Sequence, residues 1–230
     1  CIRDRLNPTI FIGGLELREP VTTLTDFLVA IVALIGYIKF SKTKDRNHKG
    51  FNYFKYYVLF FAIGMCSAAW IGHGLQAYID PVFKKIGWIF GTTGLLMLGL
   101  GSFIEIKTVS NLKWHAFFKN VFIIQYLFFV FVLIHPNWSS FTLAQISSCA
   151  SLLVFILPIH IYNYSKQKAT GSLIIISTIC YSIFPGLVYN NQLSLSKWFN
   201  YHDISHVLMA IFMLLMIYGT SKLTLNSSSG

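Results

Sequence analysis

Long runs of apolar residues, separated by short polar segments, make up most of this chain. Seven of these runs approach or reach the roughly 20 residues that a helix needs to cross a bilayer. They cover residues 21–40, 54–76, 86–103, 115–134, 142–162, 172–189 and 202–219. The alternation of a barrel strand is absent, so helices are the spanning structure to expect. The pattern predicts an all-α membrane protein, a seven-transmembrane helix bundle formed by a single domain over residues 1–220, with a polar tail at 221–230.

The composition agrees with a lipid environment. Apolar residues make up 55% of the chain, charged residues only 11%, and the mean hydropathy is +0.61. Soluble domains carry about 25% charged residues, so this chain has too few to cover a water-facing surface. We therefore expect an integral, multi-pass membrane protein. No nucleic-acid partner is expected, because no basic segment lies among stacking aromatic residues outside the apolar runs.

Charged residues are distributed unevenly between the two ends of the expected bundle. One end collects twelve Lys and Arg residues, including those of SKTKDRNHK after the first run, and the other end collects six. The more basic end is expected in the cytoplasm, which puts the N-terminus outside and the C-terminus in the cytoplasm. Six of the eight acidic residues then lie at the outer end, and they are Asp4, Glu16, Glu19, Asp26, Asp80 and Asp203.

Three histidines are expected at the outer end. His202 and His206, in YHDISH, are four residues apart, so their imidazoles project from one face of a helix. The expected topology places His73, in WIGHGLQAYID, at the same membrane depth. Three neutral imidazoles with an open fourth position form a catalytic type of zinc site, and zinc is the expected cofactor. The alternative is that the three rings only make hydrogen bonds within the bundle.

The other four histidines show no such grouping. His48 lies in a basic loop, and His135 lies beside Pro136 at the end of the fourth run. His115 and His160 lie near the cytoplasmic ends of the fourth and fifth runs. We expect all four at the membrane interface or in loops.

Asp80 has two interpretations. It follows His73 by seven residues and directly precedes Pro81. A carboxylate at the outer end could orient a water at the zinc ion or remove its proton. It could equally cap the third helix, because Asp before Pro is a good helix start.

A polar stripe opens the first run, in EPVTTLTD. Glu19 and Asp26 are seven residues apart and therefore lie about 20° from a common face of a helix, with Thr22 and Thr23 between them. A carboxylate inside a membrane helix is expected to face the bundle interior. The favoured role for these four residues is a structural polar cluster that clamps helices together through hydrogen bonds.

Together these motifs resemble a known superfamily. EPVTTLTD resembles the Glu-x-x-Asn-Thr-x-Ser-Asn opening of the first span of alkaline ceramidases. His73 and Asp80 resemble the second-span histidine and the aspartate that follows it, and HDISH resembles the seventh-span His-x-x-x-His. The chain therefore resembles the superfamily of alkaline ceramidases, adiponectin receptors and Per1-like proteins. Seven spans with the N-terminus outside are similar to the ceramidase branch.

The resemblance implies a zinc-dependent hydrolase of lipid-derived amides or esters. In that superfamily three histidines bind zinc, an aspartate holds the catalytic water, and a second-span serine assists the oxyanion. The metal ligands implied here are His73, His202 and His206. The implied catalytic aspartate is Asp80, and the implied partner is a lipid substrate or ligand within the membrane.

The position of the family serine is different in this chain. That serine stands four residues before its histidine, where this chain has Ala69. Ser67 is the expected substitute, but it lies about 120° around a regular helix from His73. It reaches the site only where the helix is locally distorted, and the glycines that flank His73 allow such a distortion.

Two other functions remain open. One is a non-catalytic seven-span receptor or scaffold with a structural metal site, which the missing serine favours. The other is a haem-binding electron carrier that uses histidine pairs across facing helices. His202 and His206 lie on one helix, an arrangement that suits haem badly.

Overall fold

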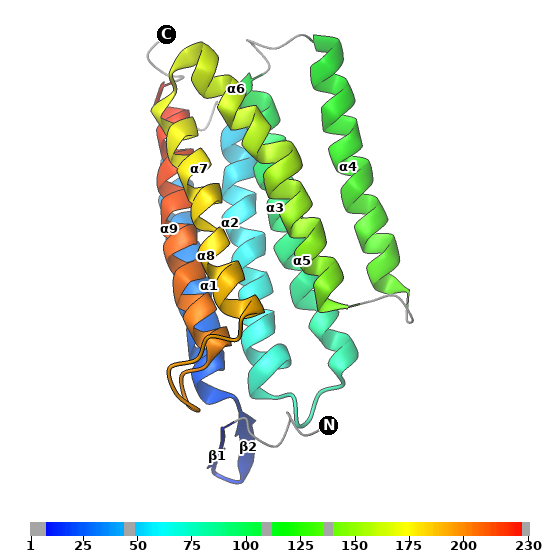
Figure 1. Ribbon diagram of the computed structural model, residues 1–230, viewed down its shortest axis with the longest axis vertical. Coiled ribbons are helices and arrows are strands. Elements are labelled where there is room, and N and C mark those ends of the chain that lie inside the picture. Colours follow the sequence, from blue (N-terminus) through cyan, green and yellow to red (C-terminus); the bar gives the residue numbers. More distant parts are fainter. Residues whose placement is uncertain (1–7, 44–48, 107–111, 136–139, 227–230) are drawn as a thin grey trace.

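The computed structural model describes residues 8–43, 49–106, 112–135 and 140–226, which are overwhelmingly helical (Figure 1). The helices in chain order are α1 (Pro20–Lys42), α2 (Lys49–Ser67), η2 (Ala68–Gly74), η3 (Pro81–Phe83), α3 (Lys84–Ile106), α4 (Leu112–Ile134), α5 (Phe141–Ala150), η4 (Ser151–Ile156), α6 (Leu157–Gln167), α7 (Thr170–Tyr181), α8 (Ile183–Asn190) and α9 (Tyr201–Asn226).

These helices join into seven continuous rods among the described residues. α2 continues into η2, η3 into α3, α5 through η4 into α6, and α7 into α8. Each of the seven rods is long and apolar enough to cross a membrane. The prediction of seven long apolar helices is confirmed. Six of the predicted runs lie within rods, and the second extends two residues past the end of η2 at Gly74.

The last helix is longer than the apolar pattern indicates. α9 continues through Asn226, so helix covers the first six residues of the expected polar tail at 221–230. The remainder of that tail, 227–230, lies outside the described residues.

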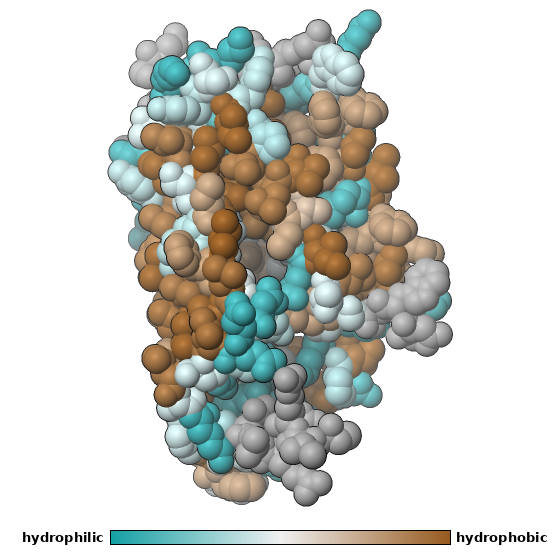
Figure 2. Space-filling view, viewed as in Figure 1, coloured by the Kyte–Doolittle hydropathy of each residue, from teal (hydrophilic) through white to brown (hydrophobic). Residues whose placement is uncertain are grey.

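The rods stand side by side along the long axis of the molecule (Figure 1). α1 packs against α2 and α9, α2 against α3, and α7 against α9. The core between them is built from large apolar side chains such as Phe40, Tyr57, Met213 and Met216, all fully buried. Hydrophobic residues cover the middle of the face shown in Figure 2, and hydrophilic residues gather mostly towards its two ends. This distribution suits a molecule surrounded by lipid.

The pairing of α2 with α3 depends on glycine. A Cβ atom at Gly64 would lie 2.9 Å from the backbone nitrogen of Gly91 and 3.0 Å from the carbonyl oxygen of Gly87. No side chain fits there without moving a backbone. Small residues at such contacts allow apolar helices to approach closely, and this contact holds the helix that leads into η2 firmly against α3.

A short β-hairpin precedes α1. β1 (Thr9–Ile12) pairs antiparallel with β2 (Leu15–Arg18) through a two-residue turn at Gly13 and Gly14. Both glycines have positive φ angles, of 58° and 85°, as a tight hairpin turn of this kind requires. The apolar pattern does not predict this hairpin, although Gly-Gly between two short apolar segments is a known hairpin signal. The hairpin lies at the end of the bundle where α1 and α9 begin (Figure 1).

Candidate functional site

Three histidine side chains converge at the end of the bundle where α1 and α9 begin. The ring centroids of His73 and His202 are 5.7 Å apart, those of His73 and His206 are 6.1 Å apart, and those of His202 and His206 are 6.4 Å apart. His73 comes from η2, and the other two come from the first turns of α9. The structure therefore brings together the three residues that the sequence pattern predicts as metal ligands.

The segment that carries His73 is a π-helix. The Leu75 amide donates to the carbonyl oxygen of Trp70 at 2.7 Å, which is the wider i→i+5 bonding of such a segment. A Cβ atom at Gly74 would meet the Ala69 carbonyl oxygen at 3.2 Å and Thr23 Oγ1 at 3.3 Å. Gly74 therefore allows η2 to approach α1 closely. Short π segments occur frequently at functional sites.

Glu19 holds the ring of His73. Its Oε2 forms a short hydrogen bond with His73 Nδ1 and also accepts from Gln76 Nε2 at 3.3 Å. Burial acts to raise the pKa of Glu19, but the hydrogen bond and the charge of His73 outweigh burial, so this pKa lies below its ordinary value. The backbone of Glu19 is left-handed, with φ 47° and ψ 54°. For a residue other than glycine such a conformation costs about 1–3 kcal/mol, and strain of this kind clusters at functional sites.

Asp26 lies between two of the rings. It is fully buried, with Oδ1 3.2 Å from His206 Nδ1 and Oδ2 3.7 Å from His73 Nε2. Thr25 Oγ1 is also 3.2 Å from His206 Nδ1. Neither oxygen of Asp26 makes a hydrogen bond with any residue that the structure describes. A buried carboxylate without such bonds lowers the stability of the fold unless a cation pairs with it or a proton donor bonds to it.

A capping box fixes the start of α9. Asn200 Oδ1 accepts from the His202 amide at 2.8 Å, and Asp203 Oδ2 accepts from the Asn200 amide at 2.7 Å. Asp203 is buried. The box therefore fixes the residue at which α9 begins, and with it the place of both histidines on the first turns of α9.

The polar cluster at the start of α1 lies inside this site. Glu19, Thr22, Thr23 and Asp26 are all buried. Thr23 Oγ1 donates to the Glu19 carbonyl oxygen at 3.1 Å. The two carboxylates contact imidazoles instead. Their spacing predicts that they share a face, but the spacing does not show which helices that face meets.

Asp80 occupies a helix cap. It is exposed, and its Oδ1 accepts from the Val82 amide at 2.8 Å at the start of η3. The carboxylates that pair with His73 and His206 are those of Glu19 and Asp26. The observed contact of Asp80 is thus that of a helix cap. Asp26, by contrast, lies beside the rings of His73 and His206.

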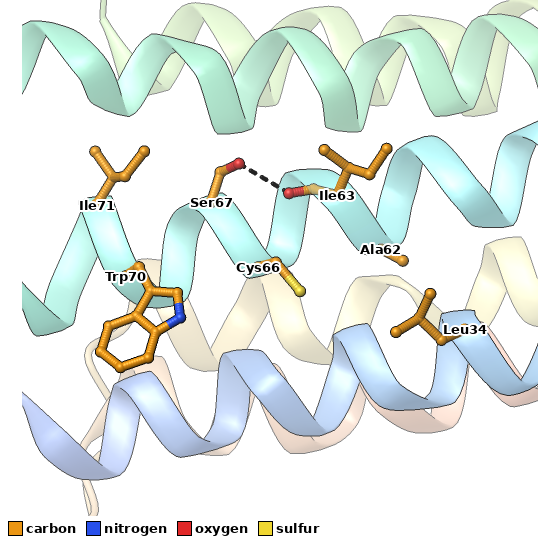
Figure 3. Close-up of a pocket in the computed structure, with 7 residues that line it drawn as sticks. All are labelled: Leu34, Ala62, Ile63, Cys66, Ser67, Trp70 and Ile71. Atoms are coloured by element: carbon orange, nitrogen blue, oxygen red, sulfur yellow. Dashed lines mark hydrogen bonds between the residues drawn. The ribbon is translucent and has the colours of Figure 1, made fainter.

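Ser67 lies on the last turn of α2, and its hydroxyl bonds to its own helix. Ser67 Oγ donates to the Ile63 carbonyl oxygen at 2.9 Å and points away from α1 in Figure 3. Ala69, the residue at the family serine position, is fully buried. The local distortion that Ser67 requires is present, since η2 starts at the next residue, but the hydroxyl bonds within α2.

The chemistry of the donor set, imidazoles next to carboxylates, is the kind that zinc sites use. A zinc-bound histidine gives one ring nitrogen to the metal, while the other is held by a carboxylate, a carbonyl or a water. Glu19 bonds to Nδ1 of His73, and Thr25 Oγ1 lies at hydrogen-bonding distance from Nδ1 of His206, which leaves Nε2 of both rings for a ligand. As they stand, no three His, Cys, Asp or Glu side chains within the described ranges are arranged so that they could hold a metal ion. Binding would therefore move these side chains.

A second buried histidine lies towards the opposite end of the bundle. His160 is 0% exposed, with Nε2 2.9 Å from Ser102 Oγ and Nδ1 3.0 Å from Ser172 Oγ. Asn163 Nδ2 donates to Ser172 Oγ at 2.9 Å. His160 is buried between helices, because hydroxyl groups from α3 and α7 satisfy both ring nitrogens. His48 lies outside the described residues.

Neither a curated protein nor a solved structure matches this sequence significantly. Residues 21–225 match a family of unknown function, DUF6962. That range covers nearly all of the seven rods and includes Asp26 and the three clustered histidines, while Glu19 lies just before it. Because the match spans most of its length, this chain belongs to the DUF6962 family.

Proposed function

We propose that this chain is a membrane hydrolase that cleaves lipid-derived amides or esters at a zinc ion held by His73, His202 and His206. One observation carries the proposal. Three imidazoles from separate parts of the chain converge beside Asp26, a fully buried carboxylate with no hydrogen bond to a described residue. Such a carboxylate is stabilised by pairing with a cation, or by a hydrogen bond from a water that is bound to a cation.

The proposal includes the arrangement in the membrane. All seven rods cross the bilayer, with the N-terminus outside and the C-terminus in the cytoplasm. The twelve-to-six division of basic residues supports this orientation. The histidine cluster then lies at the outer end of the bundle. Cysteine replacements of Lys44 and Lys197 should be labelled from opposite sides of a sealed membrane, and labelling from one side would overturn the arrangement.

The residues of the cluster have separate roles. Zinc, when bound, activates water near neutral pH and polarises a carbonyl group. Glu19 fixes the tautomer of His73 through Nδ1, and Thr25 orients His206 in the same way. The Asp26 carboxylate, with Oδ2 near His73 and Oδ1 near His206, is placed to accept a proton from a water in the cluster. The resemblance to ceramidases assigns that role to Asp80, which caps η3 instead.

A receptor or scaffold with a structural metal is the second candidate. Two observations favour it. Ala69 occupies the position of the family serine, and the Ser67 hydroxyl is bonded to the Ile63 carbonyl oxygen. In that case metal would stabilise the outer end of the bundle, and a lipid would bind without being cleaved.

Two measurements separate these candidates. Elemental analysis of the purified protein should find about one zinc per chain, and the His206→Ala variant should lose it. Turnover of long-chain N-acyl amides should stop on chelation and return when zinc is added. Zinc without turnover of any amide or ester would favour the receptor, whereas a parent protein without zinc would overturn the metal centre itself.

A further inference from the structure

An apolar groove opens on the side of the bundle next to the histidine cluster. It has a volume of about 340 Å³ and lies between Leu34 of α1 and the stretch of α2 and η2 from Ala62 to Ile71. In Figure 3, Leu34 points towards α2, while Cys66 and Trp70 point towards α1. Pockets for small molecules have volumes of about 300–1,000 Å³, so the groove is large enough for part of a lipid chain.

The groove faces the surroundings of the bundle. Leu34 is 38% exposed and Trp70 is 45% exposed, whereas Ala62 at the back is buried. In the proposed membrane arrangement these exposed side chains meet lipid. The polar groups on the walls are the Cys66 thiol and the Ser67 hydroxyl, and the hydroxyl is already bonded to Ile63. The groove therefore offers carbon surface to its occupant and almost no hydrogen bonding.

The groove leads towards the histidine cluster. Its Trp70 packs edge-on against Phe27, with ring centroids 5.5 Å apart, and Phe27 directly follows Asp26. Along α2 and η2 the distance from Ala62 to His73 is about 16 Å at the usual rise per residue. An extended chain in the groove would thus point one end at the imidazoles.

We propose that the groove holds one acyl chain of a bilayer lipid, which enters sideways between α1 and α2 and brings its carbonyl group to the histidine cluster. This inference rests on the proposed hydrolase function and deepens it, because it names the substrate class as lipids with a long, unbranched acyl chain. The apolar walls select the length and shape of that chain. They contribute nothing to selection of the polar headgroup.

Two substitutions should change chain selection in opposite directions. Cys66→Phe fills the groove, and Leu34→Ala widens it. Excluding two methylene groups from an apolar site weakens binding about tenfold. Cys66→Phe should therefore shift preference towards shorter acyl chains, and Leu34→Ala towards longer or bulkier ones. Ile35→Phe is the matched control, since Ile35 is 58% exposed, lies next to Leu34 and does not line the groove.

Photochemical labelling tests the groove without relying on turnover. The probe is a palmitoyl amide with a diazirine midway along its acyl chain, added to the full-length protein in phosphatidylcholine vesicles. Mass spectrometry should find saturable labelling on the walls between Ala62 and Ile71, competed by unlabelled palmitoyl amide. Cys66→Phe should reduce it about tenfold, and Ile35→Phe should leave it unchanged. Labelling of the exposed residues Ile124 and Phe128 of α4 should show no competition.

Failure of the groove and failure of the hydrolase proposal are distinguishable. Labelling of the walls that is absent, not competed, or unchanged in a folded Cys66→Phe protein would overturn the groove, even where zinc and turnover are found. Competed labelling in a protein without zinc or turnover would support the groove and overturn the hydrolase. If Cys66→Phe fails to fold, Leu34→Trp blocks the groove from α1, and its partly exposed position tolerates the larger ring.

Discussion

Histidines at the two ends of this bundle use their ring nitrogens differently. Both nitrogens of the buried His160 lie next to neutral hydroxyl groups, those of Ser102 and Ser172. At the end where α1 and α9 begin, the nitrogens of His73 and His206 lie next to the carboxylates of Glu19 and Asp26. The ring of His160 thus has a hydrogen-bond partner for each nitrogen, whereas the three-histidine cluster contains a buried carboxylate, that of Asp26, without a hydrogen bond to a described residue.

Whether the buried polar groups have hydrogen-bond partners distinguishes a structural cluster from a functional one better than their burial does. A buried polar network whose members are satisfied adds stability and holds helices in register. An unsatisfied buried carboxylate such as that of Asp26 lowers stability by several kcal/mol. Arrangements of this kind are concentrated at functional sites. The three-histidine cluster is therefore the one expected to bind a ligand.

The largest effect is expected on metal content. Removing a group that only supports a zinc ligand lowers affinity about 10–100-fold, and removing the ligand itself should lower it further. His206→Ala should thus reduce zinc from about one per chain to a trace, measured by elemental analysis. The control is His115→Ala, which removes a half-buried imidazole at the other end of the bundle. Equal zinc in both variants would remove the distinction between the clusters.

Asp26→Asn should act on turnover and stability in opposite ways. A general base contributes about 10²–10⁴-fold in rate, and the amide cannot serve as one. The same change removes a buried negative charge but keeps the shape of the side chain. The melting temperature should therefore be maintained or raised. Turnover of an amide substrate and thermal unfolding measure the two effects. A destabilised variant with full turnover would assign Asp26 to structure.

His160→Ala should have the reverse signature. It opens a cavity and leaves the hydroxyls of Ser102 and Ser172 without their imidazole partner. We expect a loss of about 2–4 kcal/mol in unfolding free energy, with zinc content unchanged. Ser165→Ala, on the exposed side of α6, should stay within about 0.5 kcal/mol. Loss of zinc from a folded His160→Ala protein would show that the two clusters are coupled.

The helices could be predicted from sequence, but the irregular elements could not. Apolar runs of about the length of a bilayer crossing, without the alternation of a barrel strand, leave helix as the only option. The β1–β2 hairpin is made of two four-residue strands, too short for a pattern to stand out. The π-helix at Ala68–Gly74 has no periodicity of its own in the sequence. Its flanking glycines indicate that a distortion is allowed, and tertiary contact with α1 decides that it forms.

The candidate site could be predicted in part, for the same physical reason. Helix spacing and a shared membrane depth are enough to bring His73, His202 and His206 to one end of the bundle. Which face of α1 meets those rings depends on how the helices are rotated, and no spacing within α1 contains that information. The partners Glu19 and Asp26 are therefore visible only in the structure. His160 shows the same limit, because its two hydroxyl partners come from other helices.

A smaller effect is expected for the residue that orients His73. Glu19→Gln keeps the size of the side chain but replaces the charged acceptor of His73 Nδ1. Loss of such a partner should weaken zinc binding about 10–100-fold while the protein stays folded, as competition with a chromogenic chelator can measure. Glu16→Gln is the control, since that carboxylate pairs with Arg18 on the hairpin. Equal zinc affinity in both variants would limit Glu19 to a structural role.

The smallest effect is expected at Asp80, and it completes the contrast between the two aspartates. Asp80 is exposed and accepts a hydrogen bond from the Val82 amide, a contact that asparagine makes about as well. Asp80→Asn should therefore change the unfolding free energy by less than about 0.5 kcal/mol, and should leave zinc content and turnover near the parental values. The same substitution at Asp26 removes a carboxylate from among the imidazoles. If Asp80→Asn instead keeps zinc and fold but loses turnover, the catalytic role implied by the ceramidase resemblance belongs to Asp80. The hydrogen bond from the Val82 amide to Asp80 must then break when substrate binds.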